Sequence, residues 1–446
     1  MTDSESEVDF QLLGRLDSSS GQDSEPDTPV VSIPNNASNN RFGKNQHKNC
    51  PPINDERVHA ALLEYHRRNI TNKETISKLL KIEHGITLAP SSVTRRKKHW
   101  SIQGSSATTQ SMPDLDKRQL VLDEMANDPN GKRGPRVIKE ILALRHKVHL
   151  TRDFIEATMR EEDPDGFKSR DPTAKKIKRS VLVCLGPHHE WSGDGHDKLT
   201  AIGFPIWGVR DVWSGKWLGL WVVPNNRLKE TIGYLFLKLV HEYGGMPIQM
   251  TTDCGSELVT VYGFANVLRE EFASDLPIDA LPPHKFLQSI HNITIERGWL
   301  RLRLDWGENV KIFWDAGSGI YNSSDTRHDS LVRWLWPTLI QAELDSLKDR
   351  FNNHRVRKDR GKYLPSGTSP NTAFALYQQH GGDFGLQTAD RNVIAQLMED
   401  MGGENLIRFV PVEYAAKAQQ VYDILDLPKL TMSNIWGVFQ AMLPCM

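Results

Sequence analysis

The spacing of hydrophobic residues changes near Val181 and divides the chain into two halves of different character. Before this point, apolar residues recur every three or four positions in short segments, which predicts small amphipathic helices. After it, short apolar runs alternate with longer helical patterns, which predicts strands alternating with helices. We therefore expect an all-helical region followed by an α/β domain.

The helical half predicts two similar modules, in residues 51–104 and 114–165, joined by a polar linker. In each module two helices and a turn precede a third helix, the order of a helix-turn-helix. Residues 76–88 align with residues 138–150 in register and turn, which favours a tandem repeat. A generic three-helix bundle has the same pattern. The basic residues at the third helices, expected to contact DNA phosphates, are Arg95, Arg96, Lys97, Lys98 and Arg152.

The second half predicts a mixed five-stranded sheet with flanking helices over residues 183–380. Three strands, a helix, a strand, a helix, a strand and a helix follow one another, which is the RNase H-like order. The predicted strands are 189–194, 204–210, 217–223, 246–252 and 277–281, and the predicted helices are 228–242, 257–272 and 287–304. Helical patterns also continue through a C-terminal extension, residues 381–446.

Composition agrees with a soluble, intracellular protein of 446 residues, of which 38% are hydrophobic and 25% charged. No apolar run reaches the roughly 18 residues of a membrane span. Four widely scattered cysteines argue against a disulfide framework or a zinc site. Residues 1–50 are acidic, polar and poor in aromatics, so we expect them to be disordered.

The net charge of −1 conceals a strong asymmetry along the chain. Residues 1–40 carry eight acids and one base, whereas residues 41–180 carry 29 Lys and Arg against 18 acids. A basic half predicts a polyanionic partner, although a solvated surface gives the same pattern. The predicted linker 166–182 is a nuclear-import signal, a phosphate-binding segment or only a charged linker. Its basic residues are Lys175, Lys176, Lys178 and Arg179.

Three acids stand where an RNase H-like sheet brings carboxylates together. Asp194 ends an extended segment, Asp253 ends a short apolar strand, and Glu296 lies inside a helix. Carboxylates on rigid elements are suitable ligands for Mg²⁺. Each acid also has a structural explanation: Asp194 and Asp253 in glycine-containing turns, and Glu296 in an ion pair with Arg297. Asp197 is a rival ligand, and Asp211 is expected to be a hairpin residue.

The three motif blocks around these acids resemble the integrase core of retroviral-type integrases and DDE transposases. The blocks are Trp191-Ser-Gly-Asp194, Thr252-Asp253-Cys-Gly-Ser-Glu257 and Asn292-Ile-Thr-Ile-Glu296. Residues 351–357 and 364–370 resemble the closing motifs of that family. The sequence is most similar to integrase-core proteins predicted in fungal genomes. The resemblance covers less than half of the chain.

This resemblance implies metal-dependent cleavage and joining of DNA strands by a polynucleotidyl transferase. Asp194, Asp253 and Glu296 would be the catalytic metal ligands for two Mg²⁺ or Mn²⁺ ions, with Asp194 bridging both. It implies no other cofactor, DNA as partner, possible homo-oligomers, no membrane and a nuclear location. Further candidate DNA contacts in this region are Lys285, Asn292, Arg355 and Arg357.

Two departures from the family pattern limit the analogy. The His-His-Cys-Cys zinc module of retroviral-type integrases has no counterpart here, and Leu258 stands where many relatives carry an aromatic residue or Asn. The first departure suggests that the helical modules replaced the zinc module. One alternative is a catalytically silent, domesticated DNA-binding protein that retains the fold. Another is a nuclease that acts on RNA or hybrids.

Overall fold

Two three-helix modules begin the described chain. The computed structural model describes residues 50–163, 184–287 and 293–446; the predicted disordered tail and basic linker lie outside these ranges. Each module buries an apolar cluster, and the cluster of the first module also includes Leu376 from the second half of the chain. The helices of the first are α1 (Glu56–Arg67), α2 (Lys73–His84) and α3 (Pro90–His99), and those of the second are α5 (Asp114–Ala126), α6 (Pro135–His146) and α7 (Arg152–Glu162).

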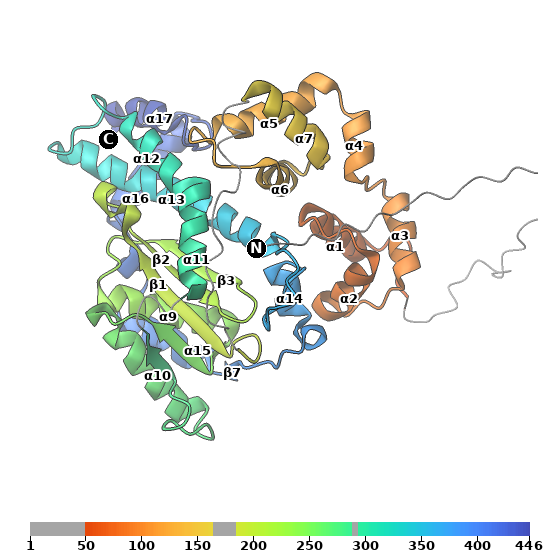
Figure 1. Cartoon of the computed structure of the whole chain (residues 1–446). Helices are drawn as coiled ribbons and strands as arrows, with labels where there is room; N and C mark the ends of the chain where they lie inside the picture. The colour runs from red at the N-terminus through yellow and green to blue at the C-terminus, as the bar shows by residue number, and fades with distance from the viewer. Residues whose placement is uncertain (1–49, 164–183, 288–292) are drawn as a thin grey trace, which may run out of the picture. The chain divides into compact units, whose positions relative to one another are not determined.

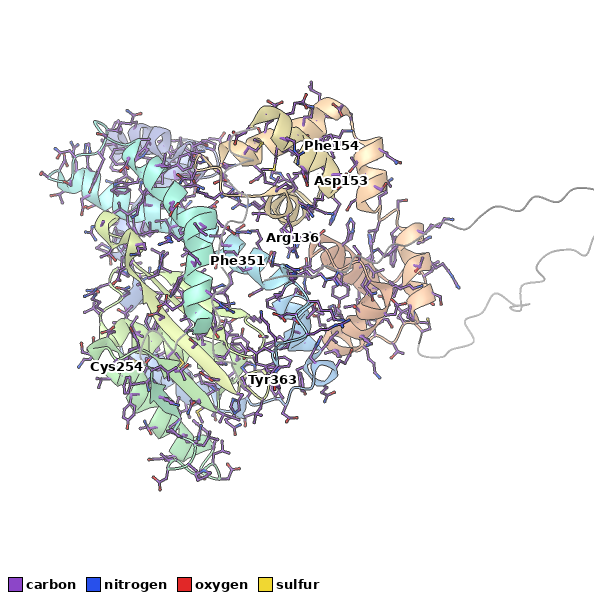
Figure 2. The ribbon with its side chains drawn as sticks, viewed as in Figure 1. Arg136, Asp153, Phe154, Cys254, Phe351 and Tyr363 are labelled. Atoms are coloured by element: carbon purple, nitrogen blue, oxygen red, sulfur yellow. The ribbon has the colours of Figure 1, made fainter. Side chains whose placement is uncertain are left out.

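The ends of these helices follow from local chemistry. Asn72 caps α2 by accepting the backbone N–H of Thr75, and Thr151 caps α7 (Figure 2, where Asp153 and Phe154 mark its first turn). At the equivalent C-terminal position, α2 is followed by Gly85 at φ 66°, but α6 is followed by Lys147 at φ 57°. This left-handed conformation suits glycine and costs energy for lysine.

A mixed five-stranded sheet forms the centre of the second half (Figure 1). Its order is β3-β2-β1-β5-β6, with β1, β2 and β3 antiparallel and β5 and β6 parallel to β1. This architecture confirms the predicted fold class. The strands are β1 (Glu190–His196), β2 (Ile206–Asp211), β3 (Trp217–Val222), β5 (Gln249–Thr252) and β6 (His284–Phe286).

Helices cover both faces of the sheet, because side chains on a strand alternate between its faces. One face packs Trp191 and Trp207 against α9 (Lys229–Tyr243) and α10 (Val259–Phe272). The other packs Trp217 and Leu220 against α11 (Ile293–Leu302) and the long helix α13 (Thr326–Asn353). The polar side chains of β1 share this second face, which carries the candidate site.

The C-terminal residues add helices to both sides of the domain. α15 (Arg391–Asp400) packs on α9, whereas α16 (Val412–Ile424) and α17 (Ile435–Met442) pack on α13. The remaining regular elements are α4 (Ser105–Ser111), α12 (Glu308–Asp315), α14 (Pro370–Ala375), β4 (Gly245–Met246) and β7 (Gln387–Thr388). Among the described residues, none of the helices combines the length and hydrophobicity that a membrane crossing requires.

The structure corrects three local predictions. The last strand is His284–Phe286 rather than 277–281, which forms turns before the Pro282-Pro283 pair. The linker between the modules contains the helix α4. In place of one helix over residues 287–304, the structure has α11, which continues through a π-helical turn into α12. Residues 288–292 of the predicted helix lie outside the described chain.

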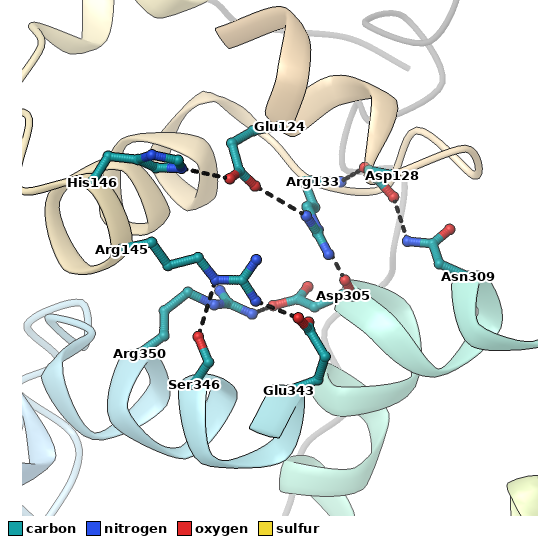
Figure 3. Close-up of polar contacts among 10 residues, drawn as sticks. All are labelled: Glu124, Asp128, Arg133, Arg145, His146, Asp305, Asn309, Glu343, Ser346 and Arg350. Atoms are coloured by element: carbon teal, nitrogen blue, oxygen red, sulfur yellow. Dashed lines mark hydrogen bonds and ion pairs between the residues drawn. The ribbon is translucent and has the colours of Figure 1, made fainter. Parts of the chain in front are cut away.

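A polar network joins the second module to the helices of the core (Figure 3). Arg133 pairs with Glu124 inside the module, and both side chains are almost completely buried. Arg133 also donates to the carbonyl of Asp305, whose carboxylate accepts from Arg350 at 2.7 Å. Further bonds of the network are Asn309 to Asp128, Arg145 to Glu343 and Ser346, and His146 to Glu124. These contacts fix α6 against α13.

Candidate active site

Asp194 is the fifth residue of β1 and lies on the face that also carries Glu190. In the antiparallel pairing with β2 it lies opposite Gly208. A Cβ atom at Gly208 would lie 2.7 Å from the rings of both Trp217 and Trp299. The absence of a side chain at this position therefore lets two indoles reach the sheet beside Asp194.

Asp253 directly follows β5, the parallel neighbour of β1. Ser192 lies opposite Thr251 in this pairing, so continuing the register by two residues brings Asp253 beside Asp194. Neighbouring strands are roughly 4.8 Å apart. Thr251 Oγ1 donates to Glu190 Oε1 at 2.9 Å, which shows that these side chains share one face. Asp253 thus leaves the end of β5, and Asp194 lies within the neighbouring strand β1 on the same side of the sheet.

Glu296 is exposed on α11, which packs against β1 and β2. Ile295 and Leu302 anchor this helix in the core. Trp299, one turn after Glu296, donates its indole N–H to Asp194 Oδ2 at 2.8 Å. This bond connects the helix that carries the predicted glutamate with the strand that carries the first aspartate.

The charges of the three acids interact. Burial, together with the negative charges of Asp253 and Glu296, raises the pKa of Asp194 to about 7, although the bond from Trp299 opposes the shift. Burial also raises the pKa of Asp253, and the charge of Glu257 adds to this effect. A divalent cation would stabilise the charged form of a buried carboxylate that has other negative charges beside it, as Asp194 has.

The acceptor chemistry of Asp194 also fits a shared metal ligand. Its Oδ1 accepts the backbone N–H of Gly195 at 2.8 Å, and its Oδ2 accepts the N–H of Trp299. A carboxylate offers about four lone pairs, so these two bonds leave each oxygen with further acceptor capacity. The residues present therefore suit the predicted ions.

The acids do not form a closed metal-binding group in this conformation. Within residues 50–163, 184–287 and 293–446, no three Asp, Glu, His or Cys side chains are close enough to hold one metal ion. Asp253 lies in the loop after β5, where the next residue, Cys254, is exposed at the edge of the domain (Figure 2). Metal binding by all three acids stays a prediction.

Other acids near the site have partners of their own. Asp211 is fully buried and accepts backbone N–H groups of His188 and Ser214, as a hairpin residue would. Asp197 accepts from Asn226 at 2.7 Å and from Arg227 at 2.9 Å. These bonds satisfy the rival ligand Asp197 without a metal.

Two basic residues contribute to the site, of which the sequence predicts Lys285 but not Arg210. Arg210 donates to the carbonyl of Thr294, which fixes the first turn of α11, and its guanidinium lies 5.0 Å from the ring centre of Trp217. Lys285 lies opposite Thr251 in the β5–β6 pairing and is exposed on the acidic face. Its charge partly offsets the burial that raises the pKa of Glu190.

The predicted DNA-binding residues of the first module divide into two groups. Arg95 and Lys98 are exposed, and Lys97 is half-buried. Arg96 is instead buried, and its guanidinium donates to the carbonyls of Pro51 and Pro52, so a phosphate contact does not fit its position. A groove of about 550 Å³ lies between the start of α2, the C-terminal part of α3 and the residues that follow α3. Among the residues that line it are Lys73, Thr94, Lys97, Lys98, Ser101 and Gln103.

The remaining candidates are dispersed over the chain. Arg152 is exposed and pairs with Glu156, whereas Arg355 and Arg357 are exposed in the segment after α13. Arg355 donates to the carbonyl of Gly367. The candidates that lie outside the described residues are Lys175, Lys176, Lys178, Arg179 and Asn292.

Comparison with known families identifies the central part of the chain. Residues 181–366 match the family model of the integrase core domain. This range contains the five strands of the main sheet and all three acids. It ends before residue 380, the predicted boundary of the core. A comparison of the chain with curated proteins finds no match.

Proposed function

We propose, on the premise that residues 181–366 are an integrase core domain, that the protein cleaves and joins DNA strands through Asp194, Asp253 and Glu296. The observation that carries this proposal is the arrangement of the acids. Asp194 on β1 and Asp253 directly after β5 lie on one face of adjacent strands, and Trp299 ties the helix of the third acid to Asp194. Polynucleotidyl transfer is the general activity that an integrase core suggests.

Asp194, Asp253 and Glu296 are the residues that would hold two Mg²⁺ or Mn²⁺ ions. When bound, such ions activate a water or a 3′-hydroxyl and stabilise the leaving oxygen of a phosphodiester. Gly195 and Trp299 orient the carboxylate of Asp194, and Arg210 fixes the start of α11. The protein's own contribution is therefore to place carboxylates on rigid elements.

DNA binding would use two basic surfaces. Lys285, which is exposed on the face that carries Asp194, would contact a DNA phosphate. The groove of the first module supplies Lys73, Lys97 and Lys98 for sequence-independent contacts along the backbone. We extend the proposal to a nuclear location and to oligomers that hold two DNA ends, both by analogy with the family.

The test is a nicking and strand-joining assay with the full-length protein, with Mn²⁺ or Mg²⁺. We expect Asp253→Asn and Glu296→Gln to lose activity while DNA binding persists. Asp197→Asn is the matched control, because this acid is nearby but satisfied by Asn226 and Arg227. Metal-dependent activity that survives in both active-site variants would reject the assignment. Competing RNA and hybrid substrates in the same assay identify the polymer.

One observation favours a second candidate, a DNA-binding protein that has lost catalysis. In the described part of the chain the acids do not close into a metal-binding group. Salt-sensitive DNA binding by the wild-type protein, with no cleavage under either divalent metal, would support this alternative.

A further inference from the structure

We propose that Trp299 is a positioning residue of the active site. Its indole N–H holds the carboxylate of Asp194 and the helix that carries Glu296 in a fixed position relative to each other. The inference rests on the proposed function, because it assigns Trp299 a role toward the ions that the acids would bind. Its basis is the 2.8 Å bond from Trp299 Nε1 to Asp194 Oδ2, which crosses from α11 to β1.

The indole of Trp299 is held on several sides. Its ring stacks on His196 with centroids 4.9 Å apart and an angle of 16° between the planes. The ring of Trp217 lies 4.9 Å away, and the side chain of Trp299 is almost fully buried. Gly208 leaves the space into which the two indoles fit. A ring fixed in this way directs its N–H to one place, so the bond restricts rotation of the Asp194 carboxylate.

The same bond fixes the helix. Glu296 and Trp299 are three residues apart on α11 and therefore lie on neighbouring positions of its surface. Anchoring Trp299 to β1 fixes the rotation of α11 about its axis and its position along that axis, and with them the position of Glu296 relative to Asp194. Residues that orient a metal ligand through a hydrogen bond typically change metal affinity about 10- to 100-fold when they are removed.

Other tryptophans show that burial alone does not explain this contact. Trp306 and Trp336 belong to the same apolar cluster as Trp299 and are equally buried. Their indole N–H groups find no acceptor among the described residues. The cluster thus tolerates tryptophan as a purely apolar side chain, whereas the N–H of Trp299 is paired with a candidate metal ligand.

The experiment compares Trp299→Phe with Trp306→Phe in the full-length protein. Each substitution removes one indole from the same cluster, but only the first removes a donor to Asp194. Mn²⁺ binding is measured by calorimetry, and the melting temperature is recorded for both. We expect Mn²⁺ affinity to fall about 10- to 100-fold in Trp299→Phe and to stay within about twofold of the wild type in Trp306→Phe.

A second measurement does not depend on the stability of the variant. In wild-type protein labelled with ¹⁵N-tryptophan, Mn²⁺ should broaden the indole signal of Trp299 more strongly than that of Trp436, which donates to Phe313. A folded Trp299→Phe variant with wild-type Mn²⁺ affinity, or a Trp299 signal that stays sharp in the Mn²⁺-bound wild type, would overturn the proposal. A wild-type protein that binds no Mn²⁺ would instead refute the metal site itself and the proposed function with it.

Discussion

The two helical modules share a backbone pattern but differ in the charge of their third helices. α3 carries four basic residues and no acids, whereas α7 carries two arginines and four acids. Both arginines of α7 pair with Glu156. The surface of this helix therefore has no excess of positive charge that would attract DNA. A repeat in the hydrophobic pattern preserves the fold of the module without preserving its surface chemistry.

The modules also differ in how they contact the core. The first packs its apolar cluster on α14 and reaches α13 through two partly exposed polar contacts, Arg67 to Asp349 and Arg68 to Asn353. The second uses the buried network around Arg133 (Figure 3). Buried charges are costly when one partner is lost. We infer that the second module serves mainly to stabilise the assembly of helices and that the first is the DNA-binding module.

The largest effect is expected for Arg133→Ala. This change leaves Glu124 buried without its arginine partner and removes the bond to the Asp305 carbonyl. We expect the free energy of unfolding to fall by about 3–5 kcal/mol in urea denaturation. Arg118→Ala is the control, because its pairs with Glu161 and Glu162 are more exposed and its loss should lower the free energy of unfolding far less. Equal effects of the two substitutions would contradict a stabilising role for the network.

A pH effect is expected where the two modules touch. His149 stacks on His66 with ring centroids 3.7 Å apart, and burial, with nearby positive charges from His66, Lys139 and Lys97, lowers the pKa of His149 to about 4. Free histidine titrates near pH 6.5, so between these values the unfolded chain binds a proton that the folded chain excludes. Stability is therefore retained above pH 6.5 and lost progressively as the pH falls toward 4.

We expect this single group to reduce the free energy of unfolding by about 2 kcal/mol between pH 7.5 and pH 5. The measurement compares the pH dependence of denaturation for the wild type and His149→Phe, which cannot be protonated. The variant should show the shallower decline over this range. Parallel pH profiles would show that His149 does not titrate as its burial implies.

DNA affinity should separate the modules directly. The double variant Lys97→Glu/Lys98→Glu reverses two charges in the groove of the first module, and we expect DNA binding to weaken at least about tenfold at low salt. Arg152→Glu reverses one charge on α7, where acids already predominate, and should change affinity less than about twofold. Fluorescence anisotropy at two salt concentrations measures both. A larger loss for Arg152→Glu would reverse the assignment of the modules.

The smallest effects concern the equivalent turns after α2 and α6. Gly85→Ala places a Cβ atom at φ 66° and should destabilise the protein by about 1 kcal/mol. Lys147→Gly removes the same strain at φ 57° and should stabilise it by up to about 1 kcal/mol. Thermal unfolding of both variants gives the comparison. Changes of the same sign would show that the two turns are not equivalent.

The fold class is predictable from the sequence because it depends on local signals, whereas metal binding by the three acids stays a prediction. Alternating apolar runs predict the strands, and the parallel pairing of β1 with β5 brings Asp194 and Asp253 together, although β1 continues two residues beyond Asp194. The last strand was misplaced because β6 has only three residues. So short a segment beside two prolines carries no reliable period.

The contacts within the site could not be predicted, since they join distant parts of the chain. Trp299 and Asp194 are 105 residues apart, and no local pattern links a tryptophan to a particular carboxylate. The burial of Arg96 did leave a signal. It lies three residues after Val93, on the inward face of α3, but its charge suggested exposure.

The position of β6 at the end of the main sheet bears on how copies of the protein can associate. An outer strand offers backbone groups that another chain can pair with, and natural proteins commonly oppose this with short or lysine-bearing edges. β6 has both properties, with three residues and an exposed Lys285 at its middle. Sheet-to-sheet extension and fibrous aggregation at this edge are therefore disfavoured, and self-association would have to use other surfaces.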